Sequence, residues 1–160
     1  MLPHIYDTLD ALKGSMYFST LDLYSGYWQV KMDEADKPKT AFITRQGLFQ
    51  FCTMPFGLCN APATFERLME LTLVGLTWRS CLVYLDDIIV YGKTFEEALE
   101  NLRLVLARIR KAGLKLKTSK CDLFRAHVPF LGRIVAQDGI YVNPAKIEAV
   151  SKWPIPRVEI

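Results

Sequence analysis

The sequence contains few of the residues that build zinc sites, disulfide frameworks or histidine-based catalytic centres. Its 160 residues include two histidines, His4 and His127, and four scattered cysteines with no CxxC pair. Zinc sites need closely spaced Cys and His ligands, so this spacing argues against one. A disulfide framework is not expected in a chain of this size, and we predict reduced, mostly buried cysteines. They are Cys52, Cys59, Cys81 and Cys121.

Long apolar runs and a strong charge of one sign are also missing. No run is long enough to span a bilayer, and we expect neither a signal peptide nor a membrane partner. The net charge of +3 permits nucleic-acid binding without arguing for it. The composition, 51% hydrophobic and 23% charged, is ordinary for a globular protein, and the length fits one domain. Both ends read as cut, so we expect a fragment of a longer chain.

Capping, turn and periodicity signals predict interleaved strands and helices. The clearest helix begins at a capping box, Thr94 with Glu97, and should end at Gly113. Several strands are joined by hairpins, which favours an α+β fold with helices on one face of a mainly antiparallel sheet. The buried face of the clearest helix should carry Leu99, Leu102, Leu106 and Ile109. Expected strands cover 16–23, 27–32, a hairpin over 40–54 turning at Gln46-Gly47, 81–92, 114–117 and 128–139; other expected helices cover 8–13, a segment capped by Asn60, and a last one from Asn143 to Pro154.

The stretch VYLDDIIVYG, residues 83–92, places Asp86 and Asp87 between two apolar runs. Burying ionised carboxylates is costly unless a positive partner binds them. A third acid, Asp22, ends another apolar strand. Asp is also a common turn residue, so the pair taken alone is equally well explained as a solvated turn.

Three carboxylates at strand ends suit hard divalent cations. Magnesium prefers oxygen ligands, and two ions about 3.5–4 Å apart can clamp the attacking and leaving oxygens of a phosphoryl transfer. Because neighbouring strand residues point to opposite faces, the two adjacent acids should not be equivalent. We expect Asp86 to be the closer ligand and Asp87 a weaker one.

Four blocks in this order resemble the reverse transcriptases of retrovirus-like retrotransposons, most closely the gypsy type. YLDD resembles the aspartate-pair signature of that family, and FSTLDLYSGYWQV resembles the motif with its other catalytic aspartate. The middle block is KTAFITRQGLFQFCTMPFGLCNAPATFERLM, and the last is GLKLKTSKCDLFRAHVPFLGRIVAQDGI. The resemblance implies a right-hand polymerase palm over 15–30 and 61–135, a partial β-hairpin fingers portion over 31–60, and the start of a thumb or connection over 140–160.

The resemblance also implies a set of site residues. Asp22, Asp86 and Asp87 would be catalytic, and with the carbonyl of Leu23 they would bind two Mg²⁺ ions, or Mn²⁺ in their place. Tyr27 would lie under the incoming sugar and block a ribose 2′-hydroxyl. The nucleotide side would consist of Tyr24, Ser25, Gly26, Tyr27, Phe56 and Gly57, and the primer and template side of Phe130, Leu131 and Gly132.

Each of these non-acidic assignments has a structural alternative. Tyr27 could be an ordinary core aromatic, Phe56-Gly57 only a turn, and Phe130-Leu131 part of the core. A basic stretch could follow phosphates, but favourable helix-end charges and solvation also explain its first four residues. It comprises Arg103, Arg108, Arg110, Lys111, Lys115, Lys117, Lys120, Arg125 and Arg133.

The implied activity is RNA-directed DNA polymerase, with deoxynucleoside triphosphates and an RNA or DNA template with its primer as partners. The resemblance implies that fingers residues before Met1, most of the thumb and the ribonuclease H region of a parent polyprotein lie outside this sequence, so we expect weak or no processive synthesis by this fragment. Lys37 and Lys39 could partly replace the missing basic contacts. The expected location is cytoplasmic, in a virus-like particle, or nuclear. The alternatives are a non-catalytic nucleic-acid-binding or assembly module, domesticated or relic, and an unrelated RNA-recognition type of domain.

Overall fold

A computed structural model describes residues 10–144, 148 and 152–153. Its main sheet has the strand order β4-β5-β1-β6, and every pairing is antiparallel. The strands are β1 (Tyr17–Asp22), β4 (Cys81–Tyr84), β5 (Asp87–Gly92) and β6 (Asp122–Arg125). Consecutive residues of β5, Ile88 to Val90, are almost fully buried, so both faces of the sheet are covered.

Two helices cover one face of this sheet, α2 (Ala61–Thr72) and α3 (Phe95–Lys111). Their buried side chains, among them Phe65, Met69 and Val105, form a core with Leu21 and Val90 of the strands. The α+β fold with helices on one face of an antiparallel sheet is confirmed.

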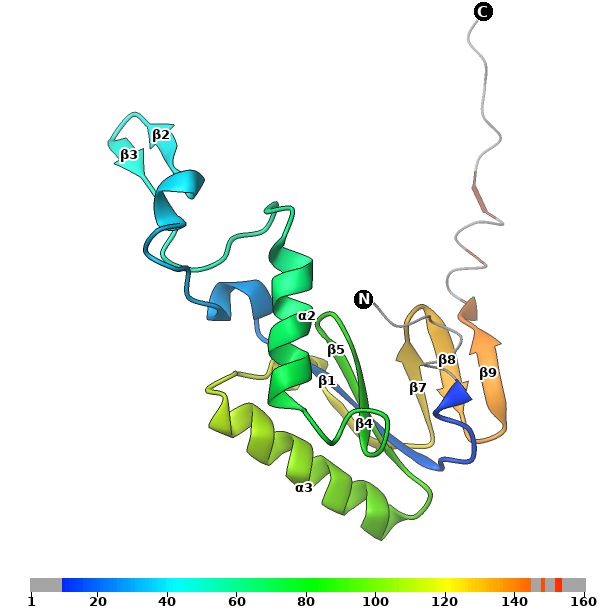
Figure 1. Cartoon of the computed structure of the whole chain (residues 1–160). Coiled ribbons are helices and arrows are strands. Elements are labelled where there is room, and N and C mark those ends of the chain that lie inside the picture. Colours follow the sequence, from blue (N-terminus) through cyan, green and yellow to red (C-terminus); the bar gives the residue numbers. More distant parts are fainter. Residues whose placement is uncertain (1–9, 145–147, 149–151, 154–160) are drawn as a thin grey trace, which may run out of the picture.

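A second sheet covers the opposite face, which the sequence did not predict. It consists of β7 (His127–Phe130), β8 (Arg133–Ala136) and β9 (Gly139–Val142). Val128 and Val135 from this sheet pack with Phe18 and Ile89 of the main sheet. Figure 1 shows the main sheet between the two helices and β7–β9.

The hairpin of β2 (Phe42–Thr44) and β3 (Gly47–Phe49) stands away from these layers (Figure 1). It was predicted, but its turn is shifted by one residue because Thr44 pairs with Gly47, which leaves Arg45 and Gln46 in the turn. A short 3₁₀ helix, η2 (Lys37–Thr40), precedes it.

Two predicted strands are wrong. The segment expected to be extended from residue 27 instead forms a 3₁₀ helix, η1 (Gly26–Gln29), after Ser25 takes a left-handed conformation with φ of 51°. The segment 114–117 makes only an isolated bridge, from Leu116 to Leu23, before η3 (Thr118–Lys120). In both cases aromatic or alternating composition suggested a strand, but tertiary contacts decided the conformation.

The ends of α3 follow the prediction, but its buried face does not. Thr94 accepts a hydrogen bond from the Glu97 N–H, while Glu97 accepts from the Lys93 N–H rather than from the capping residue. At the other end Gly113, with φ of 73°, closes a Schellman motif. The buried residues are Ala98, Leu102, Val105 and Ile109, whereas Leu106 is 37% exposed and Leu99 is half-buried.

Several smaller predictions also need correction. Two cysteines, Cys52 and Cys59, are exposed rather than buried, and all four are free thiols. Asn60 occupies the N-cap position of α2 without a side-chain cap hydrogen bond. The expected helix at 8–13 lies partly, and the helix after Asn143 mostly, outside the described residues. Within the described residues, no helix is long and apolar enough to cross a membrane.

Candidate active site

Strand pairing brings the predicted catalytic acids together from distant parts of the sequence. Asp22 at the end of β1 is the register partner of Asp87 at the start of β5. Tyr84 of β4 pairs with the same Asp87, so Leu85 and Asp86 form the two-residue turn between β4 and β5. All three acids therefore lie at one edge of the main sheet, held by strands that are buried on both faces.

Burial and mutual repulsion raise the pKa of both acids in the hairpin. For Asp86, burial is the largest cause of the raised pKa, followed by the charges of Asp87 and Asp22. For Asp87, partial desolvation of the carboxyl comes first and the charge of Asp22 second, while Lys120 lowers its pKa. Two neighbouring carboxylates that are hard to ionise are electrostatically suited to a cation.

One carboxylate oxygen in the turn has no protein partner. Oδ1 of Asp86 is buried and accepts no hydrogen bond from the described residues. An unsatisfied buried acceptor costs free energy, which a bound cation would recover. The donor set of three carboxylates is also the hard oxygen set that Mg²⁺ prefers.

A lysine side chain supplies a positive charge next to one of the three acids. Nζ of Lys120, the last residue of η3, lies 3.3 Å from Oδ2 of Asp22. The backbone supports this pair, because the Lys117 N–H donates to the Asp22 carbonyl at 2.9 Å. The sequence placed Lys120 only in a general basic stretch and missed this contact.

The three acids do not yet converge as a finished metal centre. Across the described ranges, no three His, Cys, Asp or Glu side chains are gathered closely enough to hold an ion. The charges of Asp87 and Asp22 raise the pKa of Asp86, and Lys120 pairs with Asp22. The metal-binding role of the three acids, with the Leu23 carbonyl that adjoins Asp22, thus stays a prediction that the donor chemistry fits.

A buried glutamate contacts the Leu85–Asp86 turn, and the sequence did not identify it. Glu66 on α2 is only 7% exposed, and its Oε2 accepts a hydrogen bond from the Leu85 N–H at 2.8 Å. Burial is the largest cause that raises its pKa, with Glu70 and Asp86 adding to it. The available signal was an acid directly beside the apolar stripe of Phe65 and Met69.

Two of the predicted nucleotide residues, Tyr27 and Phe56, pack together, and Tyr27 lies in the field of Asp86. The Tyr27 ring packs on Phe56 and Phe65, with ring centroids 5.1 Å and 5.3 Å apart. Its pKa is raised by burial and then by the charge of Asp86, which places its hydroxyl in the field of the acids. Gly26 fits because a Cβ there would lie 2.7 Å from Cζ of Phe65.

Gln29 links Tyr24, another predicted nucleotide residue, to Lys115 through side-chain hydrogen bonds. Its side-chain amide donates to the Tyr24 carbonyl at 2.7 Å and the Lys115 carbonyl at 3.0 Å, and its oxygen accepts from the Lys115 N–H at 2.7 Å. The sequence did not identify this clamp. Tyr24 itself is 57% exposed, and Phe56 is 60% exposed beside Gly57, whose φ is 92°.

The predicted primer residues border the same groove as Asp22 and Asp87. A cavity of about 260 Å³ is lined by Asp22, Asp87, Lys120, Phe130, Leu131 and Gly132. The Phe130 side chain is 3% exposed and belongs to the second core, so the structural alternative holds for that side chain. Leu131 and Gly132, with φ of 47° and 74°, make the tight turn between β7 and β8 that faces the groove.

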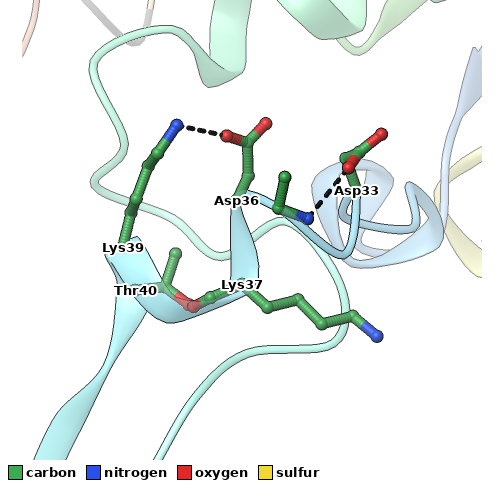
Figure 2. A network of polar contacts seen from close by, with 6 residues as sticks. Asp33, Asp36, Lys37, Lys39 and Thr40 are labelled. Carbon is green, nitrogen blue, oxygen red and sulfur yellow. Dashed lines mark hydrogen bonds and ion pairs between the residues drawn. The ribbon is translucent and has the colours of Figure 1, made fainter.

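The acidic turn before the fingers hairpin neutralises its own lysines. Lys39 contacts Asp36 at 2.5 Å (Figure 2), and Lys37 contacts Glu34 at the same distance. These hydrogen bonds are the largest causes that raise the pKa values of the two lysines. In this structure they are therefore engaged within the turn, and the idea that they replace missing basic contacts gains no support.

Comparison with known proteins shows the family. Residues 2–155 match the family model described as reverse transcriptase (RNA-dependent DNA polymerase). The chain therefore belongs to the reverse transcriptase family.

Its relatives include the Pol polyproteins of gypsy-type elements, as the resemblance implied. The chain is 44% identical over 155 residues to the retrovirus-related Pol polyprotein from transposon 297 of Drosophila melanogaster, covering 97% of this chain and 15% of that protein. It is 34% identical to the corresponding polyprotein from transposon gypsy of the same species, with the same coverage of each chain. The chain thus spans about 15% of the length of these relatives.

Solved structures match over nearly the whole chain. The foamy viral protease-reverse transcriptase in complex with an RNA/DNA hybrid superposes with a TM-score of 0.88 at 27% identity, covering 98% of this chain and 21% of that one. A second structure of that viral enzyme, in complex with double-stranded DNA, gives a TM-score of 0.89 at 27% identity, covering 98% of this chain and 27% of that one.

Proposed function

We propose that this chain is the catalytic core of an RNA-directed DNA polymerase, which transfers deoxynucleotides to the 3′-hydroxyl of a primer. The observation that carries the proposal is that strand pairing places Asp22, Asp86 and Asp87 at the same end of the main sheet, with a buried oxygen of Asp86 left without a partner among the described residues. Membership of the reverse transcriptase family supports the same activity.

The three carboxylates and the Leu23 carbonyl are the groups that would hold two Mg²⁺ ions, or Mn²⁺. When bound, such ions lower the pKa of the primer hydroxyl and stabilise the pyrophosphate leaving group. Asp86, whose Oδ1 is buried without a partner among the described residues, would gain most, and Asp22 would exchange its contact with Lys120 for the metal. Strand pairing fixes Asp22 opposite Asp87, and the turn between β4 and β5 carries Asp86 beside them.

Tyr27 would select the sugar of the incoming nucleotide. Its ring is held between Phe56 and Phe65 and cannot swing aside easily, because Phe65 is fully buried. A rigid ring under the sugar would collide with a ribose 2′-hydroxyl, and this disfavours ribonucleotides.

The primer and its template would lie along the groove that Leu131 and Gly132 border, beside Asp22 and Asp87. A nucleic-acid duplex as the partner is supported by the foamy viral structures, which are complexes with an RNA/DNA hybrid or double-stranded DNA. Relatives that are polyproteins of retrovirus-related elements support a site of action in a cytoplasmic virus-like particle, with the nucleus as the alternative.

Single-nucleotide primer extension tests the proposal. The assay uses a polypeptide extended on both sides to the length of the relatives, a primed RNA or DNA template and Mg²⁺. We expect Asp86→Asn to slow incorporation by roughly 10²–10³-fold, as when one group that stabilises transition-state charge is lost. Glu100→Gln is the matched control, since Glu100 is an exposed acid on α3 that does not line the groove. Undiminished extension by the Asp86 variant would contradict the proposal.

The same assay also tests the alternative that this chain is a non-catalytic relic that only binds nucleic acid. A non-catalytic binding module would bind a primed template equally well with Asp22 and Asp86 replaced by Asn, and would incorporate nothing in any variant. We expect the wild-type extended enzyme to incorporate nucleotides, and the isolated 160-residue chain to show weak or no processive synthesis.

A further inference from the structure

The turn that carries Asp86 has an unusual backbone. Leu85, the first of its two residues, has φ of 53°, in the left-handed region. Two-residue hairpin turns with positive φ at this position normally use Gly or Asn, because a side chain is disfavoured there. Something outside the turn must therefore hold Leu85 in this conformation.

A hydrogen bond from the Leu85 N–H to Glu66 links the turn to α2, outside the hairpin. The Glu66 carboxylate is nearly buried, and the 2.8 Å distance is that of a good charge-assisted bond. Glu66 is fixed on α2 between two residues packed in the core, Phe65 and Met69. The anchor point is thus rigid.

Apolar packing does not replace this link. A cavity of about 430 Å³ opens between α2 and the turn, lined by Pro62, Glu66, Arg67, Glu70 and Leu85 among others. Leu85 is half-buried beside this open space, and the bond from its N–H to Glu66 ties the turn to α2.

We propose that Glu66 is a positioning residue that fixes the Leu85–Asp86 turn and thereby aims the Asp86 carboxylate at the metal site. The inference rests on the proposed polymerase function, in which Asp86 is a metal ligand. Glu66 acts only through the Leu85 N–H, so it touches neither nucleotide nor metal. A buried acid in the field of Glu70 and Asp86 is electrostatically unfavourable, which a merely structural role on α2 would not require.

Three substitutions separate the hydrogen bond from charge and volume. Glu66→Gln keeps an acceptor oxygen at the same reach, Glu66→Asp keeps the charge but shortens the side chain, and Glu66→Leu keeps the volume without an acceptor. Glu70→Leu is the matched control, because Glu70 lies one turn further on α2, borders the same cavity and is exposed.

The first readout is amide hydrogen exchange at Leu85 in the 160-residue chain without substrate. We expect exchange to accelerate at least about tenfold in the Asp and Leu variants and to change little in Glu66→Gln and Glu70→Leu. Unchanged protection of Leu85 in folded Glu66→Asp and Glu66→Leu would overturn the proposal.

The second readout is primer extension by the extended enzyme. We expect kcat to fall roughly 10–100-fold in the Asp and Leu variants, with a higher Mg²⁺ requirement and a KM for the nucleotide within about twofold, as for groups that orient metal ligands. Glu66→Gln should restore kcat. Equal losses in Gln and Leu variants, or a loss confined to KM, would overturn the proposal. A wild-type enzyme that extends nothing would refute the polymerase function instead, and the exchange at Leu85 would still decide whether Glu66 fixes the turn.

Discussion

At the scale of single residues, the candidate site concentrates groups that are unfavourable without a ligand. Asp86 and Asp87 have raised pKa values, and Oδ1 of Asp86 is buried without a partner among the described residues. Stability lost at such positions is common where function requires charge to be held ready for a ligand.

Because burial and neighbouring charges raise the pKa of Asp86, we predict that Asp86→Asn stabilises the metal-free protein at neutral pH. An acid whose pKa is higher in the folded than in the unfolded state favours folding at low pH, and this contribution is lost as pH rises through the folded-state pKa. The free energy of unfolding should therefore be larger for the Asn variant at pH 7, and the difference should vanish below about pH 4, near the unfolded Asp pKa. Urea unfolding in EDTA from pH 4 to 8 measures it.

Magnesium should reverse the order of stability of the wild type and Asp86→Asn at pH 7. At ten times its Kd, a ligand that binds only the folded state adds about 1.4 kcal/mol, which we expect for the wild type and not for Asp86→Asn. Glu100→Gln, which alters an exposed acid, should gain like the wild type. If Asp86→Asn made the protein less stable than the wild type in EDTA at pH 7, the electrostatic description of the turn would be contradicted.

Tyr27 supplies a second residue-scale prediction. Tyr27→Ala should remove the ring held by Phe56 and Phe65 and lower discrimination against ribonucleotides roughly 10–100-fold in primer extension. Trp28→Ala is the control, since Trp28 packs on Phe51 and Phe56 in the same aromatic cluster. Equal loss of discrimination against ribonucleotides in both variants would contradict a specific role of Tyr27 in sugar selection.

The sequence identified the acids but could not supply the contacts that hold them. Asp22, Asp86 and Asp87 stand out because a polar residue interrupts an apolar run, a signal that is local. Glu66, Gln29 and Lys120 act through partners far along the chain, so their roles depend on the fold. No local pattern carries that information.

At the scale of elements, caps were easier to predict than faces. The ends of α3 follow from side chains within one turn, namely Thr94 with Glu97 and Gly113. Its buried stripe depends on how the helix rotates against β5 and β1, and it passes through Val105 rather than Leu106. The wrong strand at 27–32 has a similar origin, because Gly26 must approach Phe65 closely and the chain coils there.

The corrected face of α3 predicts unequal effects of two identical substitutions. Leu102→Ala should lower the free energy of unfolding by about 2–5 kcal/mol, since Leu102 is 4% exposed in the core. Leu106→Ala, at a site that is 37% exposed, should cost less than about 1 kcal/mol. Denaturant unfolding of both variants checks this, and comparable losses would mean that the helix presents a different face to the sheet.

At the scale of the whole molecule, the packed layers and the β2–β3 hairpin differ in how much of their surface is buried. The β2–β3 hairpin projects from the layers (Figure 1), and its paired residues Ile43 and Leu48 are 83% and 73% exposed. In contrast, Val83 and Ile88, which pair in the β4–β5 hairpin, are 5% and 1% exposed.

This difference in burial predicts that charges are tolerated on one hairpin and not on the other. Ile43→Lys with Leu48→Lys should change the free energy of unfolding by no more than about 0.5 kcal/mol, as for other exposed positions. The same double substitution at Val83 and Ile88 should prevent folding, because it buries two unpaired charges. Circular dichroism and urea unfolding distinguish the outcomes, and loss of palm structure in the Ile43 and Leu48 variant would show that the hairpin belongs to the core.

The most direct test of the central claim is to locate a divalent ion by NMR on the isotope-labelled chain, with Mn²⁺ added in small steps. We predict that paramagnetic broadening begins at the amides around Asp22 and around Leu85 to Asp87, two segments far apart in sequence. It should disappear from both segments in Asp22→Asn and in Asp86→Asn, and persist in Glu100→Gln. Broadening confined to other acids, such as Asp33 and Asp36, or unchanged in the Asp86 variant, would contradict a metal site built from these three carboxylates.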